Sequence, residues 1–201
     1  MSIFDYLPVS IHNMTEGGLT DEIENGKILK EVIEIVEPND ILELGFNAGH
    51  SATLWLEHSD ADLVSVDIGR HYYTTDCAKA VSEKYGNRFL YIEIDSRTTY
   101  DNVRDTEFEL IFIDASHEFN DVLIDLITGL RLNIPYFLMD DCFLNKNINA
   151  VYKAVQYFEC FTVMKEYERG QVLFYNTMYD KFPFNKFDMT FNKQKAVEAV
   201  Q

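Results

Sequence analysis

The stretch that decides the fold is residues 40–55, DILELGFNAGHSATLW. It opens with a short apolar run through Leu44, which predicts a buried strand. Gly45 and Gly49 then bracket a sharp turn, and residues 52–56 have helical composition. A strand, a glycine turn and a helix in this order are typical of a nucleotide-binding unit. Glycine lets the backbone approach a ligand closely, and the N-terminus of the helix offers unpaired N–H groups.

The spacing of the glycines bears on which nucleotide would bind. A dinucleotide fingerprint requires G-x-G-x-x-G, whereas this turn has only Gly45 and Gly49. An NAD-dependent oxidoreductase is therefore disfavoured, although it remains an alternative. The stretch instead resembles the first motif of the class I S-adenosylmethionine-dependent methyltransferases, in which an acid, here Glu43, stands two residues before the first glycine. Asn47 occupies the place of a middle glycine, and Asn tolerates left-handed backbone. A glycine turn that closes any α/β unit is the simpler interpretation of this motif alone.

Length and composition limit the class of protein. The chain has 201 residues, of which 47% are hydrophobic, so we expect one folded domain with a sizeable core. Its formal net charge of -17 disfavours binding to nucleic acid or to an anionic membrane. Three widely spaced cysteines indicate neither a disulfide framework nor a zinc site and favour a reducing, cytoplasmic location. We find no signal peptide and no apolar run of membrane-spanning length.

The remaining pattern predicts alternating strands and helices. A first helix should begin at an N-cap at Thr20 and end at Val36 before Pro38. Further strands are expected at residues 63–66, 89–94, 108–113 and 136–139, further helices at 75–85, 118–130 and 147–158, and a closing hairpin at 161–166 and 171–175. The fold class is therefore α/β, with a Rossmann-like, doubly wound, seven-stranded and mostly parallel sheet whose last strand is antiparallel.

Two of the predicted strands end in acids suited to a nucleoside. In doubly wound folds an acid at the tip of the second strand, here Asp67, accepts hydrogen bonds from ribose hydroxyls. Its alternative role is that of a turn aspartate before Gly69. The third strand ends at Asp95 and Ser96, which in the resembled family lie against the adenine. A loop cap formed by the Asp95 side chain is the plain alternative.

Carboxylates also follow the fourth and fifth predicted strands. Asp114 follows one strand, and the pair Asp140 and Asp141 follows the other. Because the carboxyl ends of parallel strands meet at one edge of a sheet, we expect the three side chains to be neighbours. Such a cluster is unfavourable unless a cation or a shared proton compensates, and hard divalent ions prefer oxygen ligands. The alternative is that these residues, with Ser116, cap the helices that follow.

The segments FELIFIDASHEFNDVLIDL and FLMDDCF resemble the metal-dependent O-methyltransferases of the catechol and macrolide-sugar type. The resemblance implies that Asp114, Asp140 and Asp141 hold magnesium or manganese, with Asp141 in place of the usual Asn. It also implies that His117 is the general base on the acceptor hydroxyl, at a position where the catechol enzyme carries Lys. Asp114 and His117 are accordingly the expected catalytic residues. The implied cofactor site consists of Glu43, Gly45, Phe46, Asn47, Gly49, Ser51, Asp67, Ile68, Asp95, Ser96 and Asp114.

Three regions follow from this interpretation. Residues 1–19 are expected to form an N-terminal cap, residues 20–175 the methyltransferase domain, and residues 176–201 an aromatic C-terminal extension. The extension would dock on the core, wall the substrate pocket or form a contact in a homo-oligomer. The sequence thus predicts an enzyme that methylates a small hydroxylated acceptor, such as a sugar, diol or phenol. A catalytically silent nucleoside-binding module is a further alternative.

Overall fold

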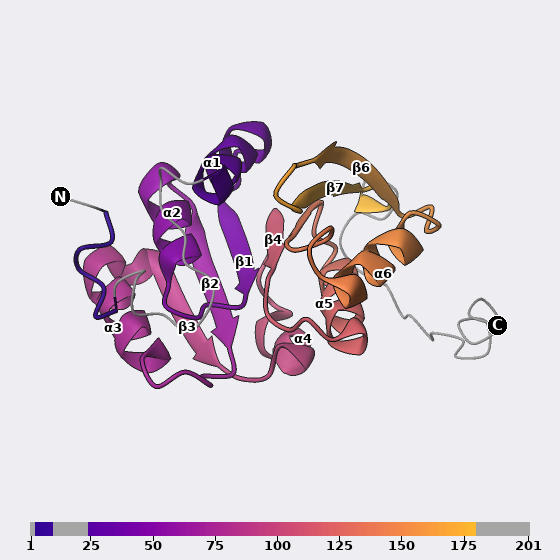
Figure 1. Cartoon of the computed structure of the whole chain (residues 1–201). Coiled ribbons are helices and arrows are strands. Elements are labelled where there is room, and N and C mark those ends of the chain that lie inside the picture. Colours follow the sequence, from indigo (N-terminus) through magenta and orange to yellow (C-terminus); the bar gives the residue numbers. More distant parts are fainter. Residues whose placement is uncertain (1–2, 10–23, 180–201) are drawn as a thin grey trace.

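The computed structural model describes residues 3–9 and 24–179. Its centre is a seven-stranded sheet in the order β3-β2-β1-β4-β5-β7-β6 (Figure 1). The strands are β1 (Asp40–Leu44), β2 (Asp62–Asp67), β3 (Phe89–Glu93), β4 (Leu110–Ile113), β5 (Tyr136–Met139), β6 (Phe161–Glu166) and β7 (Val172–Asn176). Five of them run parallel, and β7 pairs antiparallel with both β5 and β6. The predicted Rossmann-like sheet with an antiparallel last strand is confirmed.

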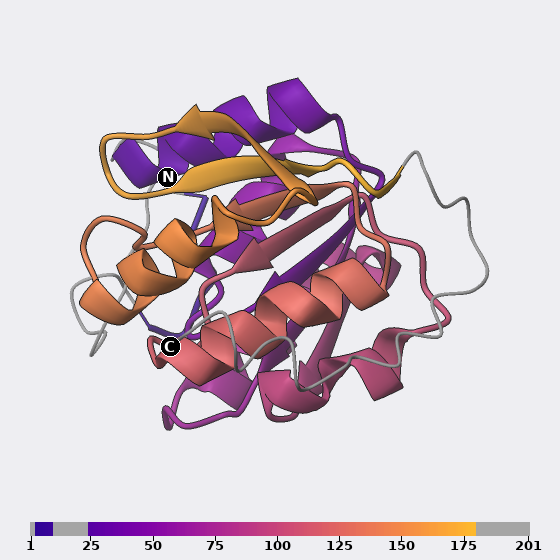
Figure 2. The ribbon, with the colours of Figure 1, turned by 90° about the vertical axis from the view of Figure 1, so that its right-hand side faces the viewer.

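Helices cover both faces of the sheet. They are α1 (Glu24–Val36), α2 (His50–His58), α3 (Thr74–Tyr85), α4 (Thr99–Val103), α5 (Phe119–Arg131) and α6 (Lys146–Val155). One hydrophobic cluster joins α1, α2 and α3 to one face, and a second joins α4, α5 and α6 to the other. Figure 2 shows α5 lying along its face of the sheet. The central strands β1, β4, β5 and β7 are buried on both sides, which explains their continuous apolar runs.

The predicted elements agree with the observed ones except at their ends. The first helix ends at Val36 as expected, whereas its expected N-cap at Thr20 lies outside the described residues. The fourth strand begins at Leu110, two residues later than predicted, and α6 stops at Val155 rather than at residue 158. The short helix α4 was not predicted, since five residues are too few to show a helical period.

A close contact holds α5 against the sheet. A Cβ at Gly129 would lie 2.4 Å from Cε1 of Phe137 on β5 and 3.2 Å from Cγ2 of Ile111 on β4. Only glycine allows this approach, because any side chain would need the helix to move outward. The contact sets the position of α5 and therefore of the loop that leads from β4 into its first turn.

Part of the predicted N-terminal cap is described. Residues 3–9 form turns, and the side chains of Leu7 and Val9 are buried in the first hydrophobic cluster. The Tyr6 hydroxyl lies 2.6 Å from Oγ1 of Thr53 on α2, and the Phe4 ring contacts the His50 ring edge to face. This segment therefore packs against α2. Most of the predicted aromatic extension lies outside the described residues.

Two further sequence expectations concern absences. The three cysteines are free, and two of them, Cys77 and Cys142, are buried. Within the described part of the chain, no helix combines the length and the apolar character needed to cross a membrane.

Candidate functional site

A cavity of about 680 Å³ opens at the carboxyl ends of the parallel strands. Its walls come from the loops that follow β1, β2, β3, β4 and β5, together with Asn25 at the start of α1. This edge is where open α/β sheets bind ligands. The structure brings together all of the predicted site residues except two, Glu43 and Gly49. Those that line the cavity are Gly45, Phe46, Asn47, Ser51, Asp67, Ile68, Asp95, Ser96, Asp114, His117, Asp140 and Asp141.

The glycine turn after β1 has the geometry that its sequence requires. Gly45 has φ of 104°, Asn47 of 51° and Gly49 of 79°, so all three lie in the region that L side chains rarely adopt. A Cβ at Gly45 would lie 2.1 Å from the carbonyl oxygen of Asp114. A Cβ at Gly49 would lie 2.6 Å from the Phe46 ring. Gly45 thus lets two strand ends meet, and Gly49 makes room behind the turn without itself lining the cavity.

Asp67, at the end of β2, binds this turn. Its Oδ2 accepts hydrogen bonds from the backbone N–H groups of Phe46 at 3.0 Å and Asn47 at 2.9 Å, and its Oδ1 accepts one from Gly69 at 2.7 Å. The expected turn role of Asp67 is therefore observed, and the side chain also holds the glycine turn. Each carboxylate oxygen can accept a further hydrogen bond, which leaves capacity for a ligand hydroxyl.

Glu43 lies behind the wall of the cavity. Its side chain is fully buried on β1, and the Ser65 hydroxyl on β2 donates to its Oε2 at 2.5 Å. Burial raises the pKa of Glu43 to about 8, while hydrogen bonds from Ser51 and Ser65 lower it. The group is therefore largely protonated at neutral pH. Ser51, which lies near Glu43, lines the cavity.

The end of β3 contributes a second polar group of residues. Asp95 caps the short 3-10 helix at Ser96–Thr98 by accepting from the Arg97 N–H at 3.0 Å. It also forms a charged hydrogen bond with Nε of Arg97 at 2.9 Å, and this contact holds the pKa of Asp95 below its usual value. The expected loop-cap role of Asp95 is thus observed, and Asp95, Ser96 and Arg97 all face the cavity.

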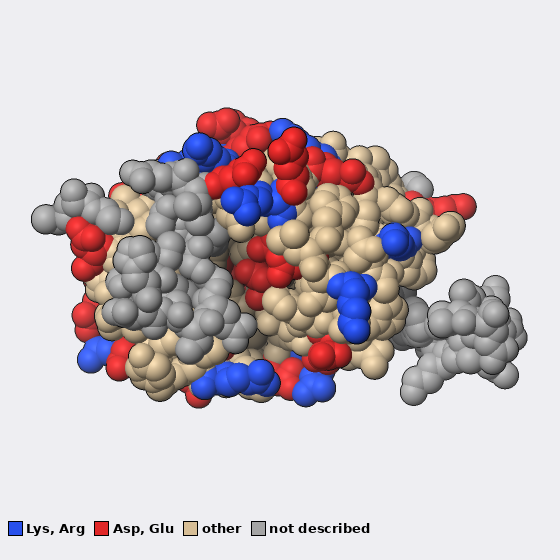
Figure 3. Space-filling view, viewed as in Figure 1, with Lys and Arg blue, Asp and Glu red and all other residues tan. Residues whose placement is uncertain are grey.

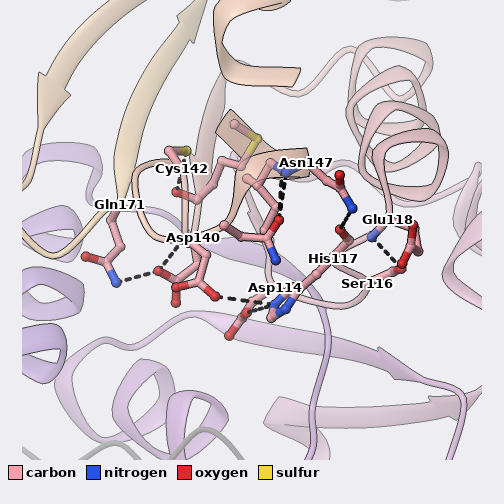
Figure 4. A network of polar contacts seen from close by, with 12 residues as sticks. Asp114, Ser116, His117, Glu118, Asp140, Cys142, Asn147 and Gln171 are labelled. Atoms are coloured by element: carbon pink, nitrogen blue, oxygen red, sulfur yellow. Dashed lines mark hydrogen bonds and ion pairs between the residues drawn. The ribbon is translucent and has the colours of Figure 1, made fainter. Parts of the chain in front are cut away.

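Acids from β4 and β5 meet at the other end of the cavity, with His117 among them (Figure 4). The Nε2 atom of His117 lies 3.4 Å from Oδ2 of Asp141 and 4.0 Å from Oδ1 of Asp114. A hydrogen bond to Asp114, together with the charges of the nearby carboxylates, raises the pKa of His117 although burial opposes this. The predicted approach of these strand-end residues is therefore confirmed.

Asp140 is held from outside the cavity. Its Oδ1 accepts from the Asp141 N–H at 2.7 Å and from Nε2 of Gln171 at 2.5 Å. Gln171 precedes β7, the antiparallel strand, and Figure 4 shows its side chain pointing toward Asp140. Burial, followed by the charges of Asp114 and Asp141, raises the pKa of Asp140 well above its ordinary value. The cluster is therefore under electrostatic stress that a cation would relieve.

The chemistry of these donors fits a hard divalent cation, because carboxylate oxygens are the preferred ligands of magnesium and manganese. The observed arrangement of these side chains does not fit such a cation. Among residues 3–9 and 24–179, no group of three or more His, Cys, Asp and Glu side chains is arranged to hold a metal ion. The imidazole of His117 instead lies against two of the three carboxylates. Binding of a cation would therefore need rearranged carboxylate rotamers.

Several residues of the cavity wall were not predicted: His50, Arg70, His71, Arg97, Ser116, Glu118 and Asp121. Most of them lie within a few residues of a predicted strand end. The sequence would therefore have predicted them if the whole loop after each strand had been assigned to the site. His50 is buried, which lowers its pKa to about 4 and keeps it neutral. In Figure 3 acidic side chains gather in the hollow near the centre of the face shown.

Part of the chain is similar to a known protein family. Residues 42–135 match the family model described as a methyltransferase domain. This stretch runs from β1 to the residue before β5 and contains the glycine turn, Asp67, Ser96 and Asp114. This part of the chain, a little under half of it, is therefore similar to a methyltransferase domain. No curated protein matches the chain.

Solved structures show the fold. A candidate O-methyltransferase from Klebsiella pneumoniae is 16% identical, with a TM-score of 0.65, and the match covers 87% of each chain. The methyltransferase PaMTH1 from Podospora anserina, bound to S-adenosylhomocysteine, is 21% identical, with a TM-score of 0.60 and coverage of 76% of this chain and 77% of that one. An O-methyltransferase from Bacillus cereus in complex with S-adenosylhomocysteine is 18% identical, with a TM-score of 0.61 and coverage of 81% and 83%.

The fold of the chain is that of the class I S-adenosylmethionine-dependent O-methyltransferases, as the sequence predicts. The domain match and these neighbours favour a methyltransferase over the NAD-dependent oxidoreductase that was the alternative. The matched region ends before Asp140 and Asp141, so it carries no information on the acidic pair.

The burial of Glu43 predicts a pH dependence of stability. Its pKa is raised from 4.5 to about 8 in the folded chain, so folding binds a proton between these values. The free energy of unfolding should therefore fall as pH rises from 4.5 to about 8. Glu43→Gln should remove this contribution and be more stable than the parent above that range by about 5 kcal/mol, since one pKa unit corresponds to about 1.4 kcal/mol. Urea unfolding at a series of pH values measures the effect.

The control for this experiment is Glu159→Gln, because Glu159 is exposed. That variant should keep the pH profile of the parent chain. Equal slopes in the parent and in Glu43→Gln would mean that the Glu43 carboxyl is ionised in the folded state.

Proposed function

We propose that this chain transfers the methyl group of S-adenosylmethionine to a hydroxyl oxygen of a small acceptor, such as a sugar, diol or phenol, with a divalent cation at Asp114, Asp140 and Asp141. The observation that carries the proposal is one cavity with two chemically different ends. One end joins a glycine turn to polar residues after β2 and β3. The other places three carboxylates and an imidazole after β4 and β5.

The nucleoside end would bind the cofactor through residues that already surround the turn. Asp67 would accept from the ribose hydroxyls with the lone pairs that its backbone contacts leave open. Ser96 would face the adenine, and the turn of Gly45, Phe46 and Asn47 would lie along the methionine portion. Two of the similar structures hold S-adenosylhomocysteine, the demethylated product, which supports this cofactor.

The acidic end would bind the acceptor. When bound, the sulfonium of the cofactor supplies an electrophilic methyl carbon, and a divalent cation lowers the pKa of an acceptor hydroxyl. His117 would receive the proton of that hydroxyl at Nε2, the atom that faces Asp114 and Asp141. Gln171 would hold one oxygen of Asp140 away from the cavity, so that its other oxygen remains for binding. Holding both reactants in one cavity would align them for direct transfer.

Cofactor binding is the first test. The chain should bind S-adenosylmethionine and S-adenosylhomocysteine but not NAD, as measured by isothermal titration calorimetry. Asp67→Ala should weaken binding of either methyltransferase ligand by about tenfold or more, because a lost charge-assisted hydrogen bond costs about 1.5 to 3 kcal/mol. Asp105→Ala, in an exposed turn, is the control. An unchanged dissociation constant in Asp67→Ala would remove this residue from the site.

Metal binding is the second test. Manganese should bind the chain and should bind Asp140→Ala at least about tenfold more weakly, because the variant loses one carboxylate ligand. Electron paramagnetic resonance of free manganese measures this without any acceptor. Treatment with a chelator should abolish turnover, and magnesium should restore it. Full turnover after chelation, or equal manganese affinity in the parent and in Asp140→Ala, would mean that the three acids are helix and turn caps and not metal ligands.

The third test concerns proton transfer. His117→Gln should turn over an accepted hydroxyl compound about a hundredfold more slowly or worse, the range expected for a lost general base, and should bind S-adenosylhomocysteine as the parent does. His58→Gln, on α2 and outside the cavity wall, is the control. Equal turnover in His117→Gln would mean that the proton leaves by another route. A chain that binds the cofactor but methylates no member of a hydroxyl library would instead support the silent nucleoside-binding module.

A further inference from the structure

The outermost strand of the sheet, β6, is exposed along most of its length (Figure 1). In the described part of the chain it pairs only with β7, so its other edge presents unpaired backbone N–H and C=O groups. Every residue from Thr162 to Glu166 is exposed, a pattern that no other strand of the sheet shows. Because successive side chains of a strand point to opposite faces, β6 is exposed on both faces as well as at its edge.

The stretch that leads into this strand and forms its first half is apolar. Residues 157–164, the apolar edge, have the sequence YFECFTVM, in which Glu159 is the one charged residue. Its exposed large side chains are Tyr157 (87%), Phe158 (47%), Val163 (36%) and Met164 (45%). Charges that protect an edge strand come only after it, at Lys165 and Glu166. An apolar edge rich in aromatic and β-branched residues, without Pro or Gly, promotes association with other chains unless it is covered.

The chain leaves the described part of the structure beside the apolar edge. The last residue of β7, Asn176, lies opposite Phe161 at the start of β6. The backbone N–H of Thr177 donates to the Cys160 carbonyl at 2.9 Å, and the Thr177 hydroxyl donates to the Glu159 carbonyl at 2.7 Å. Residues 180–201 lie outside the described part, and they follow this anchored position within a few residues.

The composition and length of residues 180–201 suit them to cover the apolar edge. Their phenylalanines are Phe182, Phe184, Phe187 and Phe191. Four lysines and three acids give the segment a net charge of +1, so the strongly acidic remainder of the chain does not repel it. β6 has six residues, and extended chain covers about 3.3 Å per residue. Residues 180–191 are therefore about twice as long as a return along β6 requires.

We propose that residues 180–191 cover the apolar edge of the same chain, with the rings of Phe182, Phe184 and Phe187 packed against the exposed side chains of residues 157–164. Burial of apolar surface on both partners drives this contact. The contact is one of side chains, because a register shift between Val163 and Lys165 interrupts the ladder of β6, and such an irregularity opposes the addition of a further strand.

This role goes beyond the proposed function and does not depend on it. No residue of β6 is among the described residues that line the cavity. The C-terminal extension would therefore protect an edge of the sheet from self-association and would not wall the substrate site.

Photo-cross-linking in the full chain tests where the segment lies. p-Benzoylphenylalanine replaces Phe184 in one protein and Phe187 in a second, and the peptides linked after irradiation are identified by mass spectrometry. We expect links to residues 157–166 within one chain. Links to the cavity loops at residues 115–118 or 140–141, or no link to residues 157–166, would overturn the inference. Links between two chains would also overturn it, because a second copy would then provide the cover.

Amide hydrogen exchange measures what the cover does. In the full chain carrying Phe182→Ser, Phe184→Ser and Phe187→Ser, exchange at residues 157–166 should become at least about tenfold faster, because local opening is easier once the cover is lost. Exchange at β3, the opposite edge strand of the same sheet, should keep the parent rate.

The matched control for the exchange experiment carries Asn185→Ser and Asn192→Ser. These changes lie in the same segment and remove no ring, so residues 157–166 should exchange at the parent rate. The inference fails if the triple serine variant also keeps that rate. It fails equally if β3 accelerates as much as residues 157–166, because the loss of protection would then be global and not local to β6.

Discussion

The approach of the turn after β1 to the end of β4 is the constraint on which the site depends. Gly45 lies so close to the Asp114 backbone that a Cβ would be 2.1 Å from its carbonyl oxygen. In the same place the Asp114 N–H donates to Leu44 at 2.9 Å, and the Gly45 N–H donates to Val66 on β2 at 2.8 Å. Three strand ends are thereby joined at one point. A larger residue at position 45 would force these strand ends apart.

This convergence concentrates negative charge. Because β2, β3, β4 and β5 each end in an acid or are followed by one within two residues, the edge gathers carboxylates that would be dispersed in an antiparallel sheet. The structure compensates them in different ways. Asp67 accepts hydrogen bonds from three backbone N–H groups, and Asp95 pairs with Arg97. The pKa of Asp140 is raised, which favours its neutral, protonated form. Asp114 and Asp141 face His117, the point at which a further positive charge would be most favourable.

The two most deeply buried acids, Glu43 and Asp125, share a further arrangement. Each lies one layer behind the cavity wall, and each is next to a serine that lines it: Ser51 for Glu43 and Ser96 for Asp125. A serine hydroxyl can rotate, so its direction is undefined until a neighbour determines it. The acidic composition of the chain thus includes groups that are hidden from solvent.

The sequence by itself determined the order of strands and helices, the sheet type and the positions of Asp67, Asp114, Asp140 and Asp141 at strand ends, because apolar periodicity and glycine turns are local signals. Only the tertiary structure decided which of these side chains meet and what they contact. It placed His117 between two acids, put Gln171, which precedes the antiparallel strand β7, beside Asp140, and buried Asp125 on α5. These contacts join residues far apart in the chain, and they follow from strand register and helix packing, which no local pattern encodes.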